Sequence, residues 1–185
     1  MSVAVEQAKA AIEREDYDSA IKLLRPLADG GLAEAEFLLG YLYFTSAEVS
    51  KTESRAWLER AAAQKHPEAL YYLACLGSTC DFGPPEDATH RALLVSSAEL
   101  GCPEAQRDLG CFHAVGDLGF PKDEVLARLW YGRAAAQGHA DAMYNYGSML
   151  LYGEGGPAEP ETGMDWIRRA AAQGDHGAIH FLANS

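Results

Sequence analysis

The stretch PEAQRDLG, residues 103–110, recurs in altered form four more times along the chain. The other copies are AEAEFLLG (33–40), PEALYYLA (67–74), ADAMYNYG (140–147) and HGAIHFLA (176–183). Every copy has alanine at its third position and ends in a large apolar residue followed by Gly or Ala. The copies start 34, 36, 37 and 36 residues apart, and self-similarity at such a period is typical of a repeat protein.

A second set of anchors follows the copies at the same period. The tetrad AAAQ occurs at 61–64, 134–137 and 170–173, and the tryptophans are Trp57, Trp130 and Trp166. Leu93 takes the tryptophan position in the unit that lies between the first two. Upstream, residues 16–28 (DYDSAIKLLRPLA) form a divergent unit, so the repeats extend over essentially the whole chain.

Each unit reads as two helices joined by a turn. The first helix, A, opens with an acidic residue, which complements the helix dipole. Small residues recur in the middle of A, where glycine normally costs stability, so we expect a close approach by the second helix. These small residues are Gly40, Ala74, Gly110 and Gly147. The second helix, B, carries the tryptophan and the AAAQ tetrad and is predicted to end at Gly101, Gly138 and Gly174.

The combined pattern is A-x-x-x-L-G, followed about twenty residues later by A-x-x-W-x-x-x-A-A-x-x-G. It closely resembles the Sel-one-like repeat, a relative of the tetratricopeptide repeat. Residues 105–138 match best, residues 69–101 diverge more, and Ser46 stands where the first unit should carry its loop glycine. The resemblance implies an all-α fold, a right-handed superhelical α-solenoid of about five helix–turn–helix repeats.

We expect a single repeat domain over residues 1–185. Its predicted parts are an N-terminal tetratricopeptide-like unit (1–32), Sel-one-like repeats at 33–66, 67–102, 103–139 and 140–175, and a C-terminal capping helix (176–185).

Composition excludes several classes of function. The net charge is -12 and the 15 basic residues are dispersed, which argues against a nucleic-acid surface. No apolar stretch is long enough to span a membrane, and the N-terminus does not resemble a secretory signal, so the expected location is cytoplasmic, with no membrane partner. An acidic chain suits a basic partner, or serves solubility alone.

The cysteines and histidines do not form a recognisable chemical motif. Cys75, Cys80, Cys102 and Cys111 lack zinc-site spacing and are expected to be reduced thiols. His176 and His180 are four residues apart on one predicted helix, but a surface pair is the better interpretation than a metal site. We therefore predict no metal, no cofactor and no catalytic site, and expect that the protein is not an enzyme.

The resemblance further implies that the A helices line a concave groove. Three helix positions per repeat should point into it, which makes an acidic rim beside aromatic residues. The candidate protein-binding residues are Glu34, Phe37, Tyr41, Glu68, Tyr71, Glu104, Arg107, Asp141, Tyr144 and Ser148. Aromatic residues are common anchors of interfaces, but at helical spacing they also form cores, and the two interpretations carry similar weight. The loops and the B helices are the competing surface.

The predicted function is protein–protein interaction, as an adaptor, scaffold or regulatory binding protein. The partner would be another protein or a peptide, with basic character favoured, and the chain itself a monomer or weak oligomer. Three alternatives stay open, one within this class and two outside it. One is a bacterial immunity protein that neutralises a secreted toxin, and the less favoured one is a hydrolase. A purely structural, self-assembling protein is a third.

Overall fold

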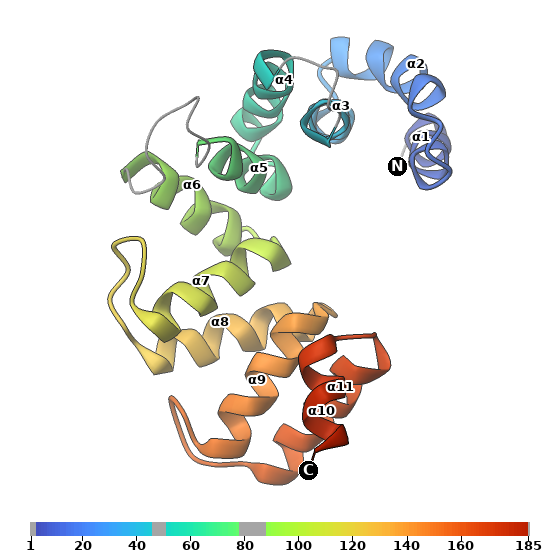
Figure 1. Ribbon diagram of the computed structural model, residues 1–185. Coiled ribbons are helices and arrows are strands. Elements are labelled where there is room, and N and C mark those ends of the chain that lie inside the picture. Colours follow the sequence, from blue (N-terminus) through green and yellow to red (C-terminus); the bar gives the residue numbers. More distant parts are fainter. Residues whose placement is uncertain (1–2, 46–50, 78–87, 185) are drawn as a thin grey trace. The chain divides into compact units, whose positions relative to one another are not determined.

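The computed structural model describes residues 3–45, 51–77 and 88–184, which form eleven α-helices and no strand (Figure 1). The predicted all-α solenoid of helix–turn–helix repeats is confirmed for this part of the chain. Ser46 and Cys80, both singled out in the sequence, lie outside the described residues.

Helices of type A and type B alternate along the chain. The A helices are α1 (Val3–Glu13), α3 (Ala33–Thr45), α5 (Pro67–Gly77), α7 (Pro103–Val115), α9 (Ala140–Tyr152) and α11 (His176–Ala183). The B helices are α2 (Tyr17–Asp29), α4 (Lys51–Ala63), α6 (Ala88–Glu99), α8 (Glu124–Ala136) and α10 (Pro160–Ala172). From α3 onward, each A helix begins at the first residue of its predicted copy.

The chain divides into two compact units, residues 1–100 and 101–185. In the first unit α1 packs on α2, α3 on α4 and α5 on α6, and α2 and α4 also contact the next A helix. In the second unit α7 pairs with α8 and α9 with α10, while α11 closes the last pair. None of the helices in the described ranges is long and apolar enough to cross a membrane.

The small residue in the middle of each A helix marks the contact with its B helix. A Cβ atom added to Gly110 would lie 2.7 Å from the Tyr131 ring, and one added to Gly147 would lie 2.7 Å from the carbonyl oxygen of Gly163. The predicted close approach of A and B is therefore confirmed. The two helices can come this close because glycine has no Cβ atom at the point of contact. A larger residue there would hold the helices further apart.

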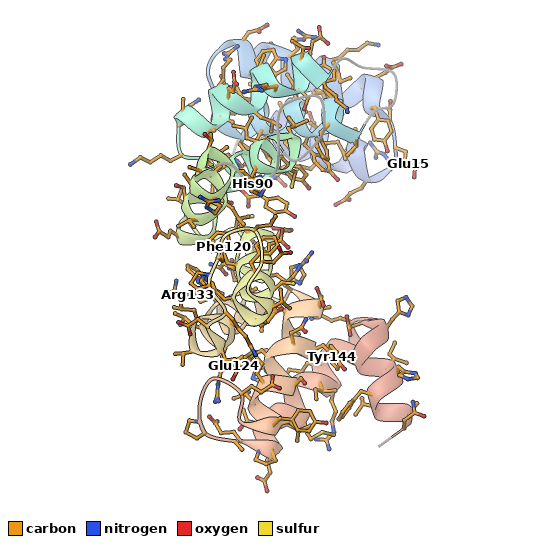
Figure 2. All side chains as sticks on the ribbon, turned by 60° about the vertical axis from the view of Figure 1, so that its left-hand side comes forward. Glu15, His90, Phe120, Glu124, Arg133 and Tyr144 are labelled. Atoms are coloured by element: carbon orange, nitrogen blue, oxygen red, sulfur yellow. The ribbon has the colours of Figure 1, made fainter. Side chains whose placement is uncertain are left out.

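The B-helix residue that faces this contact is polar in the first unit. The Ser54 hydroxyl donates to the Gly40 carbonyl at 2.8 Å, and Nδ1 of His90 lies 2.8 Å from the carbonyl oxygen of Ala74. Figure 2 labels His90 on α6. Both side chains are buried, so each polar group has a partner in the apolar contact that it enters.

In two of the three AAAQ tetrads the glutamine ties its repeat to the one before it. Gln137 Nε2 donates to the Gly101 carbonyl at 2.9 Å and to Gln106 Oε1 at 2.8 Å. Gln64 makes the same two bonds in the first unit, to the Gly31 carbonyl at 3.0 Å and to Glu36 at 2.8 Å. The tetrad thus contributes both small core residues and a clamp on the preceding turn.

The turns that follow the B helices use left-handed backbone, as the glycines predicted. Gly101, Gly138 and Gly174 have φ values of 105°, 96° and 87°. Lys65 takes the same place in its repeat with φ 61°, so a residue with a side chain adopts a conformation that favours glycine.

Each tryptophan of a B helix carries an arginine three residues later. The guanidinium carbons of Arg60, Arg133 and Arg169 lie 4.5, 4.6 and 4.9 Å from the ring centres of their tryptophans. A cation over the ring face is attracted by its quadrupole. Arg60 is also paired with Glu36 at 2.8 Å.

Candidate protein-binding surfaces

Five aromatic side chains from α3 and α5 form a cluster on the A helices of the first unit, here called the ring cluster. Its members are Phe37, Tyr41, Phe44, Tyr71 and Tyr72. Tyr72 lies at the centre, with its ring centroid 5.1 Å from that of Tyr41 and 5.2 Å from that of Phe44. The rings of Phe37 and Tyr71 lie 6.0 and 5.4 Å from the same ring. All five side chains are only partly buried, so the cluster keeps an exposed face.

The ring cluster is both core and surface. Phe37, Phe44 and Tyr72 pack against the buried residues of the neighbouring helices, which include Leu58. Tyr41 and Tyr71 contact the other rings from outside this core. The sequence leaves open whether these aromatic residues form the core or an interface. Phe37, Phe44 and Tyr72 form part of the core. Tyr41 and Tyr71 are the ones that a partner could use.

A charged cluster lies beside the rings at the start of the same helices. Nε2 of His66 donates to Oε2 of Glu34 at 2.9 Å, and Nδ1 of His66 lies 3.2 Å from Oε2 of Glu68. The other oxygen of Glu34 pairs with Nζ of Lys9 at 2.6 Å. The His66 ring stacks on Phe37 with 4.6 Å between centroids, so it joins the acidic residues to the ring cluster.

These contacts shift the pKa values of the three central groups. Burial disfavours the charged form of His66, but the bonds to Glu34 and Glu68 outweigh it and raise the His66 pKa to about 9. The hydrogen bond from His66, opposed by burial and assisted by Lys9, lowers the pKa of Glu34 to about 2. The pKa of Glu68 is lowered too, chiefly by the hydrogen bond with His66. At neutral pH the carboxylates are therefore ionised and face internal cations.

The A helices of the second unit carry a different, polar set of side chains. Arg107 pairs with Asp108 at 2.8 Å, and its Nε atom lies 3.3 Å from Oδ2 of Asp141 on the next A helix. Asn145 donates to the other oxygen of Asp141 at 2.9 Å. The predicted residues Arg107 and Asp141 thus lie together, and Asn145 completes their contact.

The remaining predicted residues of this unit make separate contacts. Tyr144 faces α11 (Figure 2), with its ring centroid 6.4 Å from that of Phe181. Ser148 lines a cavity of about 180 Å³ together with Tyr131, and Oε2 of Glu104 accepts from Cys102 at 3.2 Å. Burial raises the pKa of the Tyr131 hydroxyl, so that group stays protonated.

The predicted candidates therefore fall into separate groups. Glu34, Phe37, Tyr41, Glu68 and Tyr71 belong to one connected set in the first unit, joined by His66 and Tyr72, which the sequence prediction omitted. Tyr72, Asp108, Asn145 and Phe181 share one repeat position, one residue after Tyr71, Arg107 and Tyr144. The signal that could have identified this position is Asn145, a polar residue between Tyr144 and Tyr146.

The described residues contain no candidate metal site. No group of three or more His, Cys, Asp or Glu side chains there could hold a metal ion. His176 and His180 are exposed on α11, and Cys75, Cys102 and Cys111 carry thiols.

Known proteins match this chain in sequence and in structure. The profile of the family described as Sel1 repeat matches residues 9–32, 33–66, 103–139 and 140–175. An uncharacterized protein of Neisseria meningitidis is 32% identical over 94% of the chain and 35% of its own length. Chitin synthase regulatory factor 3 of Schizosaccharomyces pombe is 28% identical over 87% of the chain and 18% of its own length.

The solved structure of a Sel1 repeat protein from Oxalobacter formigenes superposes with a TM-score of 0.81 at 28% identity. The alignment covers 90% of this chain and 48% of that one. The chain thus spans less than half the length of each of these three proteins, and what a whole relative does is not carried over with the repeats.

Proposed function

The chain belongs to the Sel1 repeat family, and we propose that it binds another protein through the ring cluster of α3 and α5. Sel1 repeat proteins are generally protein-interaction modules, and the fold is a scaffold for binding rather than for catalysis. The observation that carries the proposal is the ring cluster itself. Five aromatic side chains touch one another on two consecutive A helices and keep an exposed face.

Aromatic rings are suited to this task because they offer a large contact area and lose little conformational entropy on binding. Tyr41 and Tyr71 each add a hydroxyl group, so they serve an interface that is apolar at its centre and wet at its edge. The proposed partner therefore places aliphatic or aromatic side chains on these two rings.

A basic partner stays a prediction, but charge does not carry the proposal. Glu34 is paired with Lys9 and His66, and Glu68 also lies against His66. An incoming cation would have to compete with these internal ones, so the acidic residues are better suited to hold the start of the two helices than to attract the partner.

The test compares the chain with a variant that carries Tyr41→Ser and Tyr71→Ser. Tagged proteins are used for affinity capture from an extract of the source organism, at physiological salt, and the recovered proteins are quantified by mass spectrometry. The matched control is Tyr17→Ser, since Tyr17 is 49% exposed and lies on the B helix α2. We expect one protein to be recovered with the chain and the control and to be lost with the double variant.

Recovery of the same proteins by all three would contradict the proposal. The narrower prediction of an immunity protein is tested by whether the recovered partner is toxic. If that partner is toxic when expressed alone, co-expression of the chain should restore growth and the double variant should not. If the partner is not toxic, the immunity prediction is wrong while the binding function stands.

A further inference from the structure

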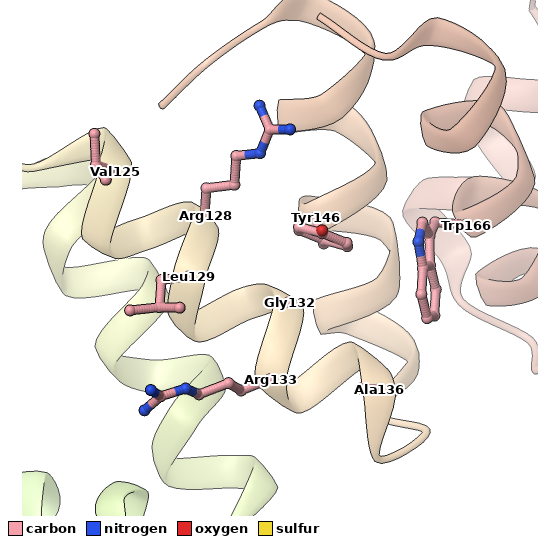
Figure 3. A pocket seen from close by; sticks show the side chains of 8 residues that line it. All are labelled: Val125, Arg128, Leu129, Gly132, Arg133, Ala136, Tyr146 and Trp166. Carbon is pink, nitrogen blue, oxygen red and sulfur yellow. The ribbon is translucent and has the colours of Figure 1, made fainter. Parts of the chain in front are cut away.

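The B helices of the second unit enclose a groove that the proposed function does not use (Figure 3). It lies between α8 and α10, with a side chain of α9 between them, and has a volume of about 560 Å³. The residues that line it are Val125, Arg128, Leu129, Gly132, Arg133, Ala136, Tyr146 and Trp166. We call it the B-helix groove.

One wall of the B-helix groove is aliphatic and the other aromatic. Val125 and Leu129 are 64% and 45% exposed, and as residues four apart on α8 they lie on one face of the helix. Across from them, the rings of Tyr146 and Trp166 meet edge to face with 5.8 Å between centroids. A Cβ atom on Gly132 would lie 3.1 Å from the Tyr146 ring, so the glycine leaves the space that this ring occupies.

The charged residues that line the groove are both arginines, in a chain whose net charge is -12. Arg128 is engaged internally, since it donates to the Pro157 carbonyl and to Glu159, both at 2.8 Å. Arg133 is exposed and lies over the Trp130 ring, and within the described part of the chain it forms no ion pair. Arg169, stacked on Trp166 at 4.9 Å, adds a second positive charge beside the aromatic wall.

We propose that the B-helix groove binds a segment of a partner protein in which a carboxylate side chain lies next to an aliphatic or aromatic one. The carboxylate pairs with Arg133, whose planar guanidinium can donate two parallel hydrogen bonds. The apolar side chain enters between Leu129 and Trp166 and removes their exposed surface from water. Charge complementarity selects an acidic segment, because Glu159 already offsets Arg128, whereas the exposed charge of Arg133 would repel a basic segment.

This surface is independent of the ring cluster. The ring cluster belongs to A helices of the first unit, whereas the groove is built mainly from B helices of the second unit. One partner or two could therefore use the chain, and each surface can be removed by substitutions that leave the other intact.

The first experiment pans a phage-displayed library of random short peptides against the 185-residue chain and against Arg133→Glu. The matched control is Arg168→Glu, since Arg168 is also on a B helix, has a side chain that is 61% exposed, and does not line the groove. We expect enriched peptides to combine Asp or Glu with an apolar residue. Their enrichment should be lost on Arg133→Glu and kept on Arg168→Glu.

The second experiment measures the affinity of the most enriched peptide by fluorescence anisotropy. Loss of a partly desolvated ion pair should weaken binding about tenfold for Arg133→Glu, and Gln in place of the acidic residue of the peptide should weaken it about as much. Leu129→Ser, which keeps the charge, should weaken binding as well. The ring-cluster variant should bind the peptide unchanged, which separates this proposal from the proposed function.

Three results would overturn the proposal. In the first, no enriched peptide depends on Arg133. In the second, the peptides that depend on it lack acidic residues. In the third, analytical ultracentrifugation shows that the chain self-associates and that Arg133→Glu abolishes the association, in which case the groove is an interface between copies of this chain.

Discussion

Oε2 of Glu34 and Nε2 of His66 lie 2.9 Å apart, although 32 residues separate them in the sequence. Glu34 is on α3, and His66 precedes α5, so the pair connects the starts of two consecutive A helices. Lys9 extends the connection to α1 and Glu68 to α5 itself. Charged groups from three successive repeats therefore hold the first unit together at one end of its A helices.

The stability of the chain should depend on the charge of His66. Its pKa of about 9 in the folded chain, against an ordinary value of 6.5, means that the folded state binds the proton more tightly. The stabilisation is fully present below pH 6.5 and is lost as the pH rises through about 9. The free energy of unfolding lost in His66→Gln should thus be larger at about pH 6 than at about pH 10, as measured by urea unfolding.

The acidic side of the profile provides a second check. The pKa of Glu34 is lowered from 4.5 to about 2, so its contribution is present above pH 4.5 and lost as the pH falls through about 2. Glu34→Gln should therefore cost stability at neutral pH but little in strong acid.

His176→Gln is the control for His66→Gln, since His176 is exposed on α11. An equal cost of His66→Gln at both pH values would contradict this account.

Lys65→Gly should stabilise the chain. Lys65 has φ 61°, and a side chain at such an angle costs about 1 to 2 kcal/mol relative to glycine. The greater freedom of glycine in the unfolded chain offsets about 0.4 to 1 kcal/mol of this, which leaves a gain of at most about 1.6 kcal/mol, with a midpoint of about 0.8 kcal/mol. Urea unfolding followed by circular dichroism measures the difference.

The reverse substitution at the equivalent position of the repeat 103–139 serves as the control. Gly138 has φ 96°, and a Cβ atom there would meet nothing within 4 Å, so Gly138→Ala tests backbone strain without a steric clash. It should destabilise the chain by about 1 kcal/mol or more. If Lys65→Gly proves destabilising while Gly138→Ala is neutral, the left-handed turn is not what the two positions share.

The helices of this fold could be predicted from the sequence because the repeat reports them several times. Ala35, Ala105 and Ala142 are fully buried, and each A helix begins where its copy begins. Gly110 and Gly147 predicted the close A–B contacts for the same reason. A residue type that recurs at one position in every unit points to a contact that every unit makes.

The candidate surface could be predicted only in part, because it depends on residues that differ from unit to unit. Tyr72 comes one residue after Tyr71, which was predicted to point into the groove, and occupies the same repeat position as the buried Leu38. The repeat period alone therefore assigns Tyr72 to the core and does not show that its ring also contacts four other rings. His66 could not be assigned to the site from the sequence, because nothing in its local sequence indicates that Glu34 of the preceding repeat lies beside it.

Gln137→Ala should destabilise the chain by about 1 to 2 kcal/mol. Gln137 Nε2 donates to the Gly101 carbonyl and to the buried Gln106, so the substitution removes two hydrogen bonds, one of them to a buried side chain. Gln173→Ala is a matched control from the last AAAQ tetrad. Within the described residues the Gln173 side chain makes no such bonds, and the position equivalent to Gln106 is Met143, which offers no oxygen.

The measurement is urea unfolding of both variants beside the unchanged chain. A cost for Gln137→Ala and a change within about 0.5 kcal/mol for Gln173→Ala would support the clamp, since surface changes without partners are nearly neutral. Equal costs would mean that the glutamine acts through helix propensity and not through the preceding turn.

Gly147→Ala should be more costly than Gly40→Ala, although both glycines occupy the same position of an A helix. Alanine is favoured over glycine in a helix by about 1 kcal/mol, so any loss of stability must come from the contact with helix B. A Cβ atom on Gly40 would lie 2.7 Å from Cγ of Leu58, a side chain that can change its rotamer. One on Gly147 would lie 2.7 Å from the carbonyl oxygen of Gly163, which belongs to the backbone of α10.

The two losses of stability should differ because a side chain can move away from the new Cβ atom more easily than a helix backbone can. Repacking Leu58 costs about 1 to 3 kcal/mol and helix propensity offsets about 1 kcal/mol of this, so Gly40→Ala should lose at most about 2 kcal/mol. At Gly147 the clash persists unless α9 and α10 separate, because the added Cβ would also lie 3.1 Å from the backbone nitrogen of Ile167. We expect a loss of about 3 kcal/mol or more in urea unfolding. A smaller loss at Gly147 than at Gly40 would show that the helix pair can shift as a body, and that its spacing is set by the side chains around the glycines.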